Sequence, residues 1–214
     1  MKNLAIKTAS NHLELELLSK GFKNIIGIDE VGRGAFAGPV VVGAYIFTKD
    51  SKVIPGTTDS KKVSPKNREL ISKTILTKER IIRIGEVNQI NEIGIGKTVE
   101  HLIQSIIKNY SSKDTFFLID GHFPILTHQN SLQVLKGDLL HYSISCASII
   151  AKVYRDEIMH NFDKAYPHYN FIKNVGYGTA THIEAIKKYG ITPLHRLSFK
   201  PIANIANNQR KISQ

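Results

Sequence analysis

The feature that most constrains the fold is a short apolar segment that ends abruptly in acidic residues. Residues 25–28 are rich in β-branched side chains, which predicts a buried β-strand, and Asp29 and Glu30 mark the point where this strand leaves the core. A strand end holds its side chains more rigidly than a free loop does. Because Mg²⁺ and Mn²⁺ prefer carboxylate oxygens, the segment predicts a metal site at one edge of a sheet.

A glycine-rich loop follows these acids directly. Gly32 and Gly34 lack a Cβ atom, so backbone N–H groups can approach a phosphate or a sugar closely. Arg33 adds a planar, permanently charged donor that suits phosphate. The loop therefore predicts binding of a phosphate or sugar next to the metal ligands in the chain.

The rest of the chain alternates between strand and helix patterns, which predicts an α/β fold. The expected strands are 25–29, 40–47, 80–87, 116–120 and 132–136. The expected helices are 13–19, 67–76 after a Ser64-Pro65 start, 97–108, 145–162 and 181–189, the last ending at Gly190. No helix separates the first two strands, so some pairing should be antiparallel, and we expect a mixed sheet flanked by helices.

The length of 214 residues favours a single domain over residues 1–214, since a domain usually contains about 100–200 residues. The segment from about 203 to 214 is polar and basic, with no long apolar face. We expect it to be a flexible tail that could still touch nucleic acid.

Net charge and cysteine content limit the class of binding partner and the cellular compartment that fit this chain. The net charge of +11 favours an anionic partner such as nucleic acid, although a merely solvated basic surface fits the charge equally well. The single cysteine, Cys146, cannot form an internal disulfide, which favours a reducing, cytoplasmic compartment, and its apolar neighbours indicate a buried structural thiol. No signal peptide or membrane-spanning run is present in the sequence, so we expect a soluble protein without a membrane partner.

Two further acids stand where predicted strands end. Asp120 follows 116–119, and Asp138 follows 132–135. Ligands collect outside the carboxyl ends of strands in an open α/β sheet, so these acids can converge with Asp29 and Glu30. Clustered carboxylates repel one another unless cations are bound, and two Mg²⁺ or Mn²⁺ ions would meet that need. Taken singly, Asp120 and Asp138 are equally compatible with ordinary turn residues.

Three other motifs fail on context. Gly94 to Thr98 suggests a nucleotide phosphate loop, but Asn91 stands where that motif requires glycine. The spacing from Gly34 to Gly38 is one residue too long for a dinucleotide fingerprint, and a strand rather than a helix follows. The histidines show no paired zinc spacing.

Seven blocks, in order, resemble the ribonuclease HII family of type 2 ribonucleases H. The blocks are 27–39, 59–62, 118–121, 136–138, 145–156, 176–179 and 195–199. The resemblance therefore extends over residues 27–199. It implies a ribonuclease-H-like mixed sheet flanked by helices, with a helical C-terminal part.

The resemblance also assigns roles to individual residues. It implies that the metal ligands and catalytic residues are Asp29, Glu30, Asp120 and Asp138, and that Gly32, Arg33 and Gly34 hold the ribonucleotide and its junction with DNA. Tyr177 would pack on the neighbouring deoxyribose. Phosphate contacts, or contacts behind them, are implied for Lys61, Lys152, Arg155 and Arg196, with ordinary solvated cations as the alternative for each.

The activity that the resemblance implies is hydrolysis of the phosphodiester on the 5′ side of ribonucleotides. The substrates would be RNA/DNA hybrids and DNA duplexes with embedded ribonucleotides, as in DNA replication and repair, and the products would carry 5′-phosphate and 3′-hydroxyl ends. We expect a monomer that uses two metal ions. Two alternatives remain open: a module that binds hybrids without cutting them, and a structure-specific DNA nuclease.

The chain departs from the family pattern at two places. Asn174 and Val175 replace the usual His-Lys, which removes a cation and a histidine near Tyr177 and should affect substrate affinity rather than chemistry. Residues 93–95 replace the usual Leu-Asn-Ile, which should loosen one helix start. The related ribonuclease HIII family carries an additional N-terminal domain, for which the residues before Ile25 are too few.

Overall fold

A computed structural model describes residues 8–75 and 77–212. Its residue contacts divide the chain into two compact units. The first, here called the sheet unit, comprises the described residues of Met1–Val31, Val42–Arg83 and Glu100–Val153. The second, here called the helical unit, comprises those of Gly32–Val41, Ile84–Val99 and Tyr154–Gln214. The single domain expected over residues 1–214 stays a prediction.

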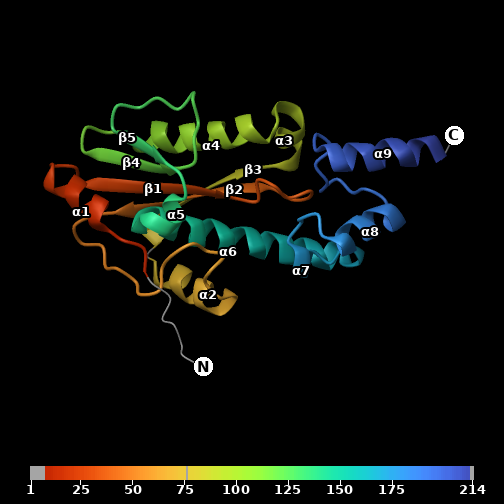
Figure 1. Ribbon diagram of the computed structural model, residues 1–214, viewed down its shortest axis with the longest axis horizontal. Helices are drawn as coiled ribbons and strands as arrows, with labels where there is room; N and C mark the ends of the chain where they lie inside the picture. The colour runs from red at the N-terminus through yellow and green to blue at the C-terminus, as the bar shows by residue number, and fades with distance from the viewer. Residues whose placement is uncertain (1–7, 76, 213–214) are drawn as a thin grey trace. The chain divides into compact units, whose positions relative to one another are not determined.

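A mixed five-stranded sheet with flanking helices forms the centre of the sheet unit, as the sequence predicts. The strands are β1 (Asn24–Val31), β2 (Val40–Phe47), β3 (Arg80–Gly85), β4 (Thr115–Asp120) and β5 (Ser131–Val134), and their order is β3-β2-β1-β4-β5. β4 pairs in parallel with both β1 and β5 (Figure 1). The carboxyl ends of these three strands therefore share one edge of the sheet.

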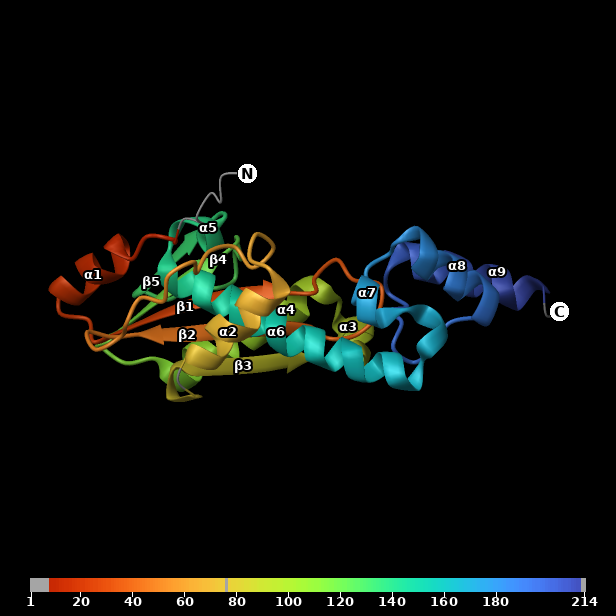
Figure 2. The ribbon, with the colours of Figure 1, turned by 90° about the horizontal axis from the view of Figure 1, so that it is seen from below.

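Helices cover both faces of this sheet. They are α1 (His12–Ser19), α2 (Pro65–Thr74), α4 (Ile95–Tyr110), α5 (Gly137–Leu140) and α6 (Tyr142–Ala165), with a short 3₁₀ turn η1 (Thr77–Glu79) before β3. Figure 1 shows α4 on one face and α2 and α6 on the other, and Figure 2 shows α2 and α6 in front of the sheet when it is seen from below. Helix α2 begins as predicted, because the Ser64 side chain accepts a hydrogen bond from the Asn67 N–H.

Two glycines let α6 lie directly against the sheet. A Cβ atom on Gly27 of β1 would be 2.2 Å from the backbone of Ser143, and one on Gly43 of β2 would be 2.5 Å from the Ala147 carbonyl oxygen. Larger residues cannot occupy either position without moving the helix. Buried side chains such as Ile25 fill the space around these contacts.

The helical unit is built from short helices around its own apolar core. These are α3 (Val87–Ile93), α7 (Phe171–Asn174), α8 (Ala180–Tyr189) and α9 (Lys200–Ile212), with a 3₁₀ turn η2 (Pro167–Tyr169). Met159, Phe171, Ile186 and Ile202 are buried in this core. Gly190 ends α8 with φ +87°, which confirms the predicted C-terminal cap.

Most predicted elements are confirmed within a few residues, but the end of the chain differs from expectation. Residues 203–212 belong to helix α9, which was not among the predicted elements, and the flexibility of this segment stays a prediction. Ile202 and Ala206 lie four positions apart on this helix and are both buried, a short apolar stripe that the sequence analysis overlooked. Residues 213–214 lie outside the described part of the chain.

None of the helices in the described part of the chain has both the length and the apolar character that crossing a bilayer requires.

Candidate metal centre and substrate loop

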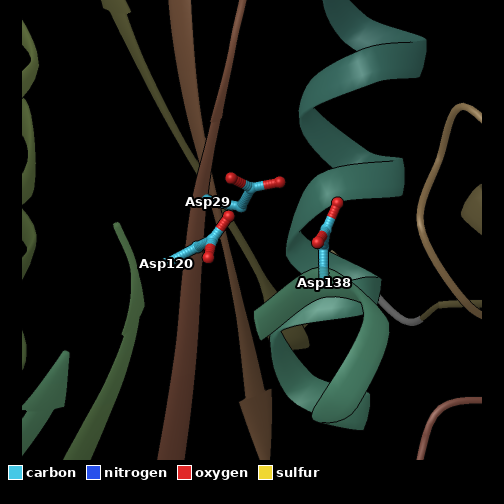
Figure 3. A group of neighbouring side chains, drawn as sticks. All are labelled: Asp29, Asp120 and Asp138. Atoms are coloured by element: carbon cyan, nitrogen blue, oxygen red, sulfur yellow. The ribbon is translucent and has the colours of Figure 1, made fainter. Parts of the chain in front are cut away.

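Three of the four predicted acids meet at one edge of the sheet. Asp29 from β1, Asp120 from β4 and Asp138 from α5 each offer a carboxylate oxygen, and these oxygens all lie within 4.8 Å of one another (Figure 3). The parallel pairing of β1 and β4, with Ile28 opposite Ile119, brings the first two together. Residues about 90 positions apart in the chain thus form one carboxylate cluster.

Backbone geometry fixes the other two acids. The Gly137 N–H donates to Asp120 Oδ1 at 2.8 Å. Lys136, just before it, has φ +58°, and this left-handed residue turns the chain from β5 into α5. Asp138 lies in the first turn of α5, not directly at a strand end as predicted, and its carbonyl oxygen accepts from Ser145 Oγ at 2.7 Å.

Burial and like charge act on the acids of this cluster. Asp29 is only 7 % exposed, and burial, followed by the charges of Glu30 and Asp120, holds its pKa well above the usual range. Burial, Asp59 and Asp120 raise the pKa of Asp138 to about 6, against the opposing effect of Lys61. Three hard oxygen donors within 4.8 Å of one another are a donor set that fits a divalent cation, and burial and like charge raise the pKa of two of them, Asp29 and Asp138.

Glu30 does not belong to the three-acid group. Asp29 and Glu30 both lie within β1 and not beyond its end. Consecutive strand residues point to opposite faces of a sheet, so the two side chains point in different directions. The Glu30 N–H donates to Asp29 Oδ1 at 2.8 Å, and its charge contributes to the raised pKa of Asp29. The role of Glu30 as a metal ligand stays a prediction.

The structure adds residues that the sequence analysis did not assign. Asp59 lies close enough to raise the pKa of Asp138, and its Oδ1 accepts from the Lys61 N–H at 2.9 Å. A hydrogen bond from Ser148 lowers the pKa of Asp29, and Ser148 Oγ lies 3.0 Å from the hydroxyl of the buried Ser60. Asp59 and Ser60 lie in residues 59–62, one of the blocks that resemble the ribonuclease HII family. An acid in the same block as Lys61 could therefore have pointed to Asp59 in the sequence.

Two predicted phosphate contacts, Arg155 and Arg196, are fully buried in the helical unit. Arg155 donates to the carbonyl oxygens of Pro39 (2.8 Å), Ala37 (3.2 Å) and Val175 (2.8 Å). Arg196 donates to the Gly38 and Arg33 carbonyls at 2.9 and 3.0 Å. Both guanidinium groups therefore hold the glycine loop, in place of the surface phosphate contacts that were one expected role. Lys61 is exposed and Lys152 is partly exposed.

The loop and Tyr177 are close neighbours within the helical unit. Gly32 has φ +93°, and a Cβ atom there would lie 2.1 Å from Arg155 Nε, so this position requires glycine. Gly34 faces Tyr177, whose ring would be 4.0 Å from a Cβ atom. The Gly176 carbonyl accepts from the Phe36 N–H at 2.7 Å, which ties the two segments together.

The departure at positions 174 and 175 has a structural role. Asn174 is buried, its Nδ2 donates to the Tyr169 carbonyl at 2.7 Å, and its Oδ1 accepts from the Gly176 N–H at 2.8 Å. Val175 has φ +42°, which is strained for a β-branched residue. Asn174 therefore supports the backbone before Tyr177 through its side-chain hydrogen bonds.

Comparison with known proteins shows the family of the chain. The family model described as Ribonuclease HII matches residues 26–202. The Ribonuclease HII of Chlamydia caviae is 41% identical over 215 residues, which cover 96% of this chain and 100% of the relative.

Two solved structures share the fold. The crystal structure of the ribonuclease H2 from Pyrococcus horikoshii OT3 has a TM-score of 0.71 and 24% identity, covering 88% of this chain and 99% of that one. The crystal structure of Bst-RNase HIII in complex with Mn²⁺ has a TM-score of 0.65 and 19% identity, covering 92% of this chain and 73% of that one. The chain belongs to the ribonuclease HII family and is a type 2 ribonuclease H, an endonuclease that cleaves the RNA of RNA/DNA hybrids.

Proposed function

We propose that the protein hydrolyses the phosphodiester bond on the 5′ side of ribonucleotides, both in RNA/DNA hybrids and at ribonucleotides embedded in duplex DNA. The products would carry 5′-phosphate and 3′-hydroxyl ends. The observation that carries the proposal is the cluster of Asp29, Asp120 and Asp138, whose carboxylate oxygens lie within 4.8 Å of one another.

These three acids, together with Glu30, would hold two Mg²⁺ or Mn²⁺ ions. When bound, the ions would activate water and stabilise the leaving oxygen. The protein's own part is to keep the carboxylates in place: Gly137 orients Asp120 through its N–H, and Ser148 donates to Asp29. The Mn²⁺ complex of Bst-RNase HIII makes Mn²⁺ a reasonable ion to test beside Mg²⁺.

Substrate recognition is proposed for the glycine loop and Tyr177. A 2′-hydroxyl both donates and accepts hydrogen bonds, so the backbone of Gly32 and Gly34 can pair with it in a way that DNA cannot match. The Tyr177 ring would pack on the next sugar and favour one without that hydroxyl. Arg33, Lys61 and Lys152 would contact phosphates, which position a duplex without reading its sugars.

One cleavage assay separates this function from its two alternatives. Matched duplexes of all DNA, of DNA with one ribonucleotide and of RNA/DNA hybrid are incubated with Mg²⁺, Mn²⁺ or a chelator, and the ends are mapped. Metal-dependent cutting 5′ to the single ribonucleotide is expected. Binding without cutting would favour the binding module, and equal cutting of all-DNA duplex would favour the DNA nuclease.

We also propose that the protein is a monomer and lies in the cytoplasm. The single, buried Cys146 supports a reducing compartment. Sedimentation of the purified protein tests the monomer directly.

A further inference from the structure

Two buried histidines in the helical unit lie next to each other without contact with solvent. His182 of α8 is 0 % exposed and His195 is 1 % exposed. Their Nε2 atoms are 3.2 Å apart, and the ring centroids are 5.4 Å apart. A bond between two Nε2 atoms needs a hydrogen on one of them and a lone pair on the other, so the pair has a direction.

The neighbouring hydrogen bonds determine that direction. The backbone N–H of Thr192 donates to His195 Nδ1 at 2.9 Å, so this nitrogen is the acceptor of a neutral ring and its hydrogen is on Nε2. His195 Nε2–H then donates to His182 Nε2. The hydrogen of neutral His182 is left on Nδ1, which lies 2.9 Å from the Tyr177 carbonyl oxygen.

This chain of bonds ends on the backbone of the tyrosine that the proposed function places against the substrate. The Tyr177 carbonyl also accepts from the Thr179 N–H at 2.8 Å, and the Tyr177 N–H donates to the Asn174 carbonyl at 2.9 Å. His182 is the one side chain among these partners, and it connects Tyr177 to a segment near Thr192. The ring of Tyr177 is therefore aimed by a backbone that the histidines help to hold.

We propose that His195 and His182 are positioning residues that fix Tyr177 for discrimination between a deoxyribose and a ribose at the junction. The inference rests on the proposed function, because it assumes that Tyr177 contacts the substrate. Neither histidine touches the reacting atoms. Each histidine acts through its tautomer. The hydrogen bond from Thr192 sets the tautomer of His195, and the hydrogen bond from His195 sets that of His182.

The surroundings keep both rings neutral. Aromatic rings pack around the pair: Tyr169 lies 5.3 Å from His195, and Phe171 lies 5.4 Å from His182, between ring centroids. Tyr169 is the titratable group packed against them, and its hydroxyl donates to the Gly190 carbonyl at 2.8 Å. Burial lowers the pKa of His182, and burial together with His182 lowers the pKa of His195 to about 4.

Two substitutions of His182 test this chain of hydrogen bonds from His195 through His182 to Tyr177, here called the relay. Both substitutions disturb the same buried position. Both His182→Asn and His182→Leu remove the bond to His195 and should lower the melting temperature. The amide nitrogen of asparagine can occupy the place of Nδ1 and still donate to Tyr177, whereas leucine cannot. For a duplex with one ribonucleotide, we expect His182→Leu to raise KM about tenfold with kcat within twofold, and His182→Asn to stay within threefold of wild type. Equal KM values for the two variants would overturn the relay.

Tyr177→Ala distinguishes failure of the relay from failure of the proposed function. Tyr177→Ala should raise KM, and adding His182→Leu to it should raise KM no further, because the relay acts only through Tyr177. If Tyr177→Ala leaves KM unchanged, the proposed role of Tyr177 fails. If it raises KM while His182→Leu does not, only the relay fails.

A measurement on the wild-type protein avoids any folding defect of the variants. Nitrogen-15 NMR of labelled histidine at pH 7.5 distinguishes the two neutral tautomers from each other and from the protonated ring. Hydrogens on Nε2 of His195 and on Nδ1 of His182 are expected. The opposite tautomers, or a protonated ring, would contradict the inference.

Discussion

The carboxylate cluster and the two arginines that hold the glycine loop carry charges of opposite sign, and the protein compensates these charges differently. In the sheet unit, Asp29, Asp120 and Asp138 are brought together with repulsion between them. In the helical unit, Arg155 and Arg196 are fully buried, and their donors, apart from Arg196 Nη2, are directed to backbone carbonyls. The arginines find partners within the protein, whereas the acids need a cation from outside.

This difference separates the structural role of a buried charge from its functional role. A buried charge that is satisfied by carbonyl dipoles holds a loop in one conformation. A group of like charges left uncompensated costs stability until a ligand binds. Metal should therefore stabilise the cluster directly and leave the hydrogen bonds of the glycine loop unchanged.

The largest effect is expected from Asp29→Asn. The change removes one negative ligand from the cluster, so cleavage should fall by at least about 10³-fold while duplex binding is retained. Without metal the variant should be at least as stable as wild type, because it removes a carboxylate that resists ionisation. Asp114→Asn, at a surface ion pair with Lys23, makes the same chemical change and should leave cleavage intact. Near-normal turnover by Asp29→Asn would refute the metal site.

Arg155→Met should lower stability strongly while the protein still folds. It leaves the carbonyls of Pro39, Ala37 and Val175 without their donor, and we expect a loss of about 3 kcal/mol in the free energy of unfolding, measured with urea. Mg²⁺ should raise the stability of the variant and of wild type by equal amounts. A greater gain in the variant would show that the loop also depends on metal.

Gly34→Ala and Gly32→Ala form a matched pair in the loop. At Gly34 a methyl group fits and only the Tyr177 ring is within reach, so stability should change little while KM for a single-ribonucleotide duplex rises about tenfold. At Gly32 the positive φ and the contact with Arg155 should prevent normal folding. Thermal melting and steady-state kinetics measure both effects. If Gly34→Ala leaves KM unchanged, the substrate does not approach that face.

The smallest expected effect is on the pH dependence of stability, to which Asp138 and His195 contribute in opposite directions. In chelator, the raised pKa of Asp138 adds stability at low pH that is lost as pH rises from about 4 to about 6. His195 acts in the opposite direction: its pKa is lowered to about 4, so stability is complete above about 6.5 and is lost as pH falls. Asp138→Asn removes the first effect, so between pH 7 and pH 5 it should lose about 1 kcal/mol relative to wild type. If urea unfolding shows the same change in the free energy of unfolding between pH 7 and pH 5 for the variant and for wild type, this assignment is wrong.

The sequence predicted the elements and the convergence of three acids because both depend on local pattern and simple topology. Apolar runs that end in Asp29 and Asp120 become parallel neighbours, and parallel strands put their carboxyl ends at one edge. The Ser64 cap and the Gly190 cap were readable for the same reason: each depends on a few adjacent residues.

Other parts of the site depend on contacts between distant segments, which no local pattern encodes. Arg155 and Arg196 look like any other cations in the sequence, and only the carbonyls of 33–39 decide that they are buried. Glu30 follows Asp29 so closely that the two acids read as one motif, but strand geometry separates their directions. The histidine pair is invisible because its members stand thirteen positions apart with no motif spacing.

The parallel pairing of β1 with β4 has a consequence for synthesis of the chain on the ribosome. Asp29 emerges early, but β4 and α5, which supply Asp120 and Asp138, are made much later. A half-made chain therefore carries only the first of the three clustered acids and cannot form the carboxylate cluster. Under the proposed function, cleavage can begin only after β4 and α5 have been synthesised and all three carboxylates can meet.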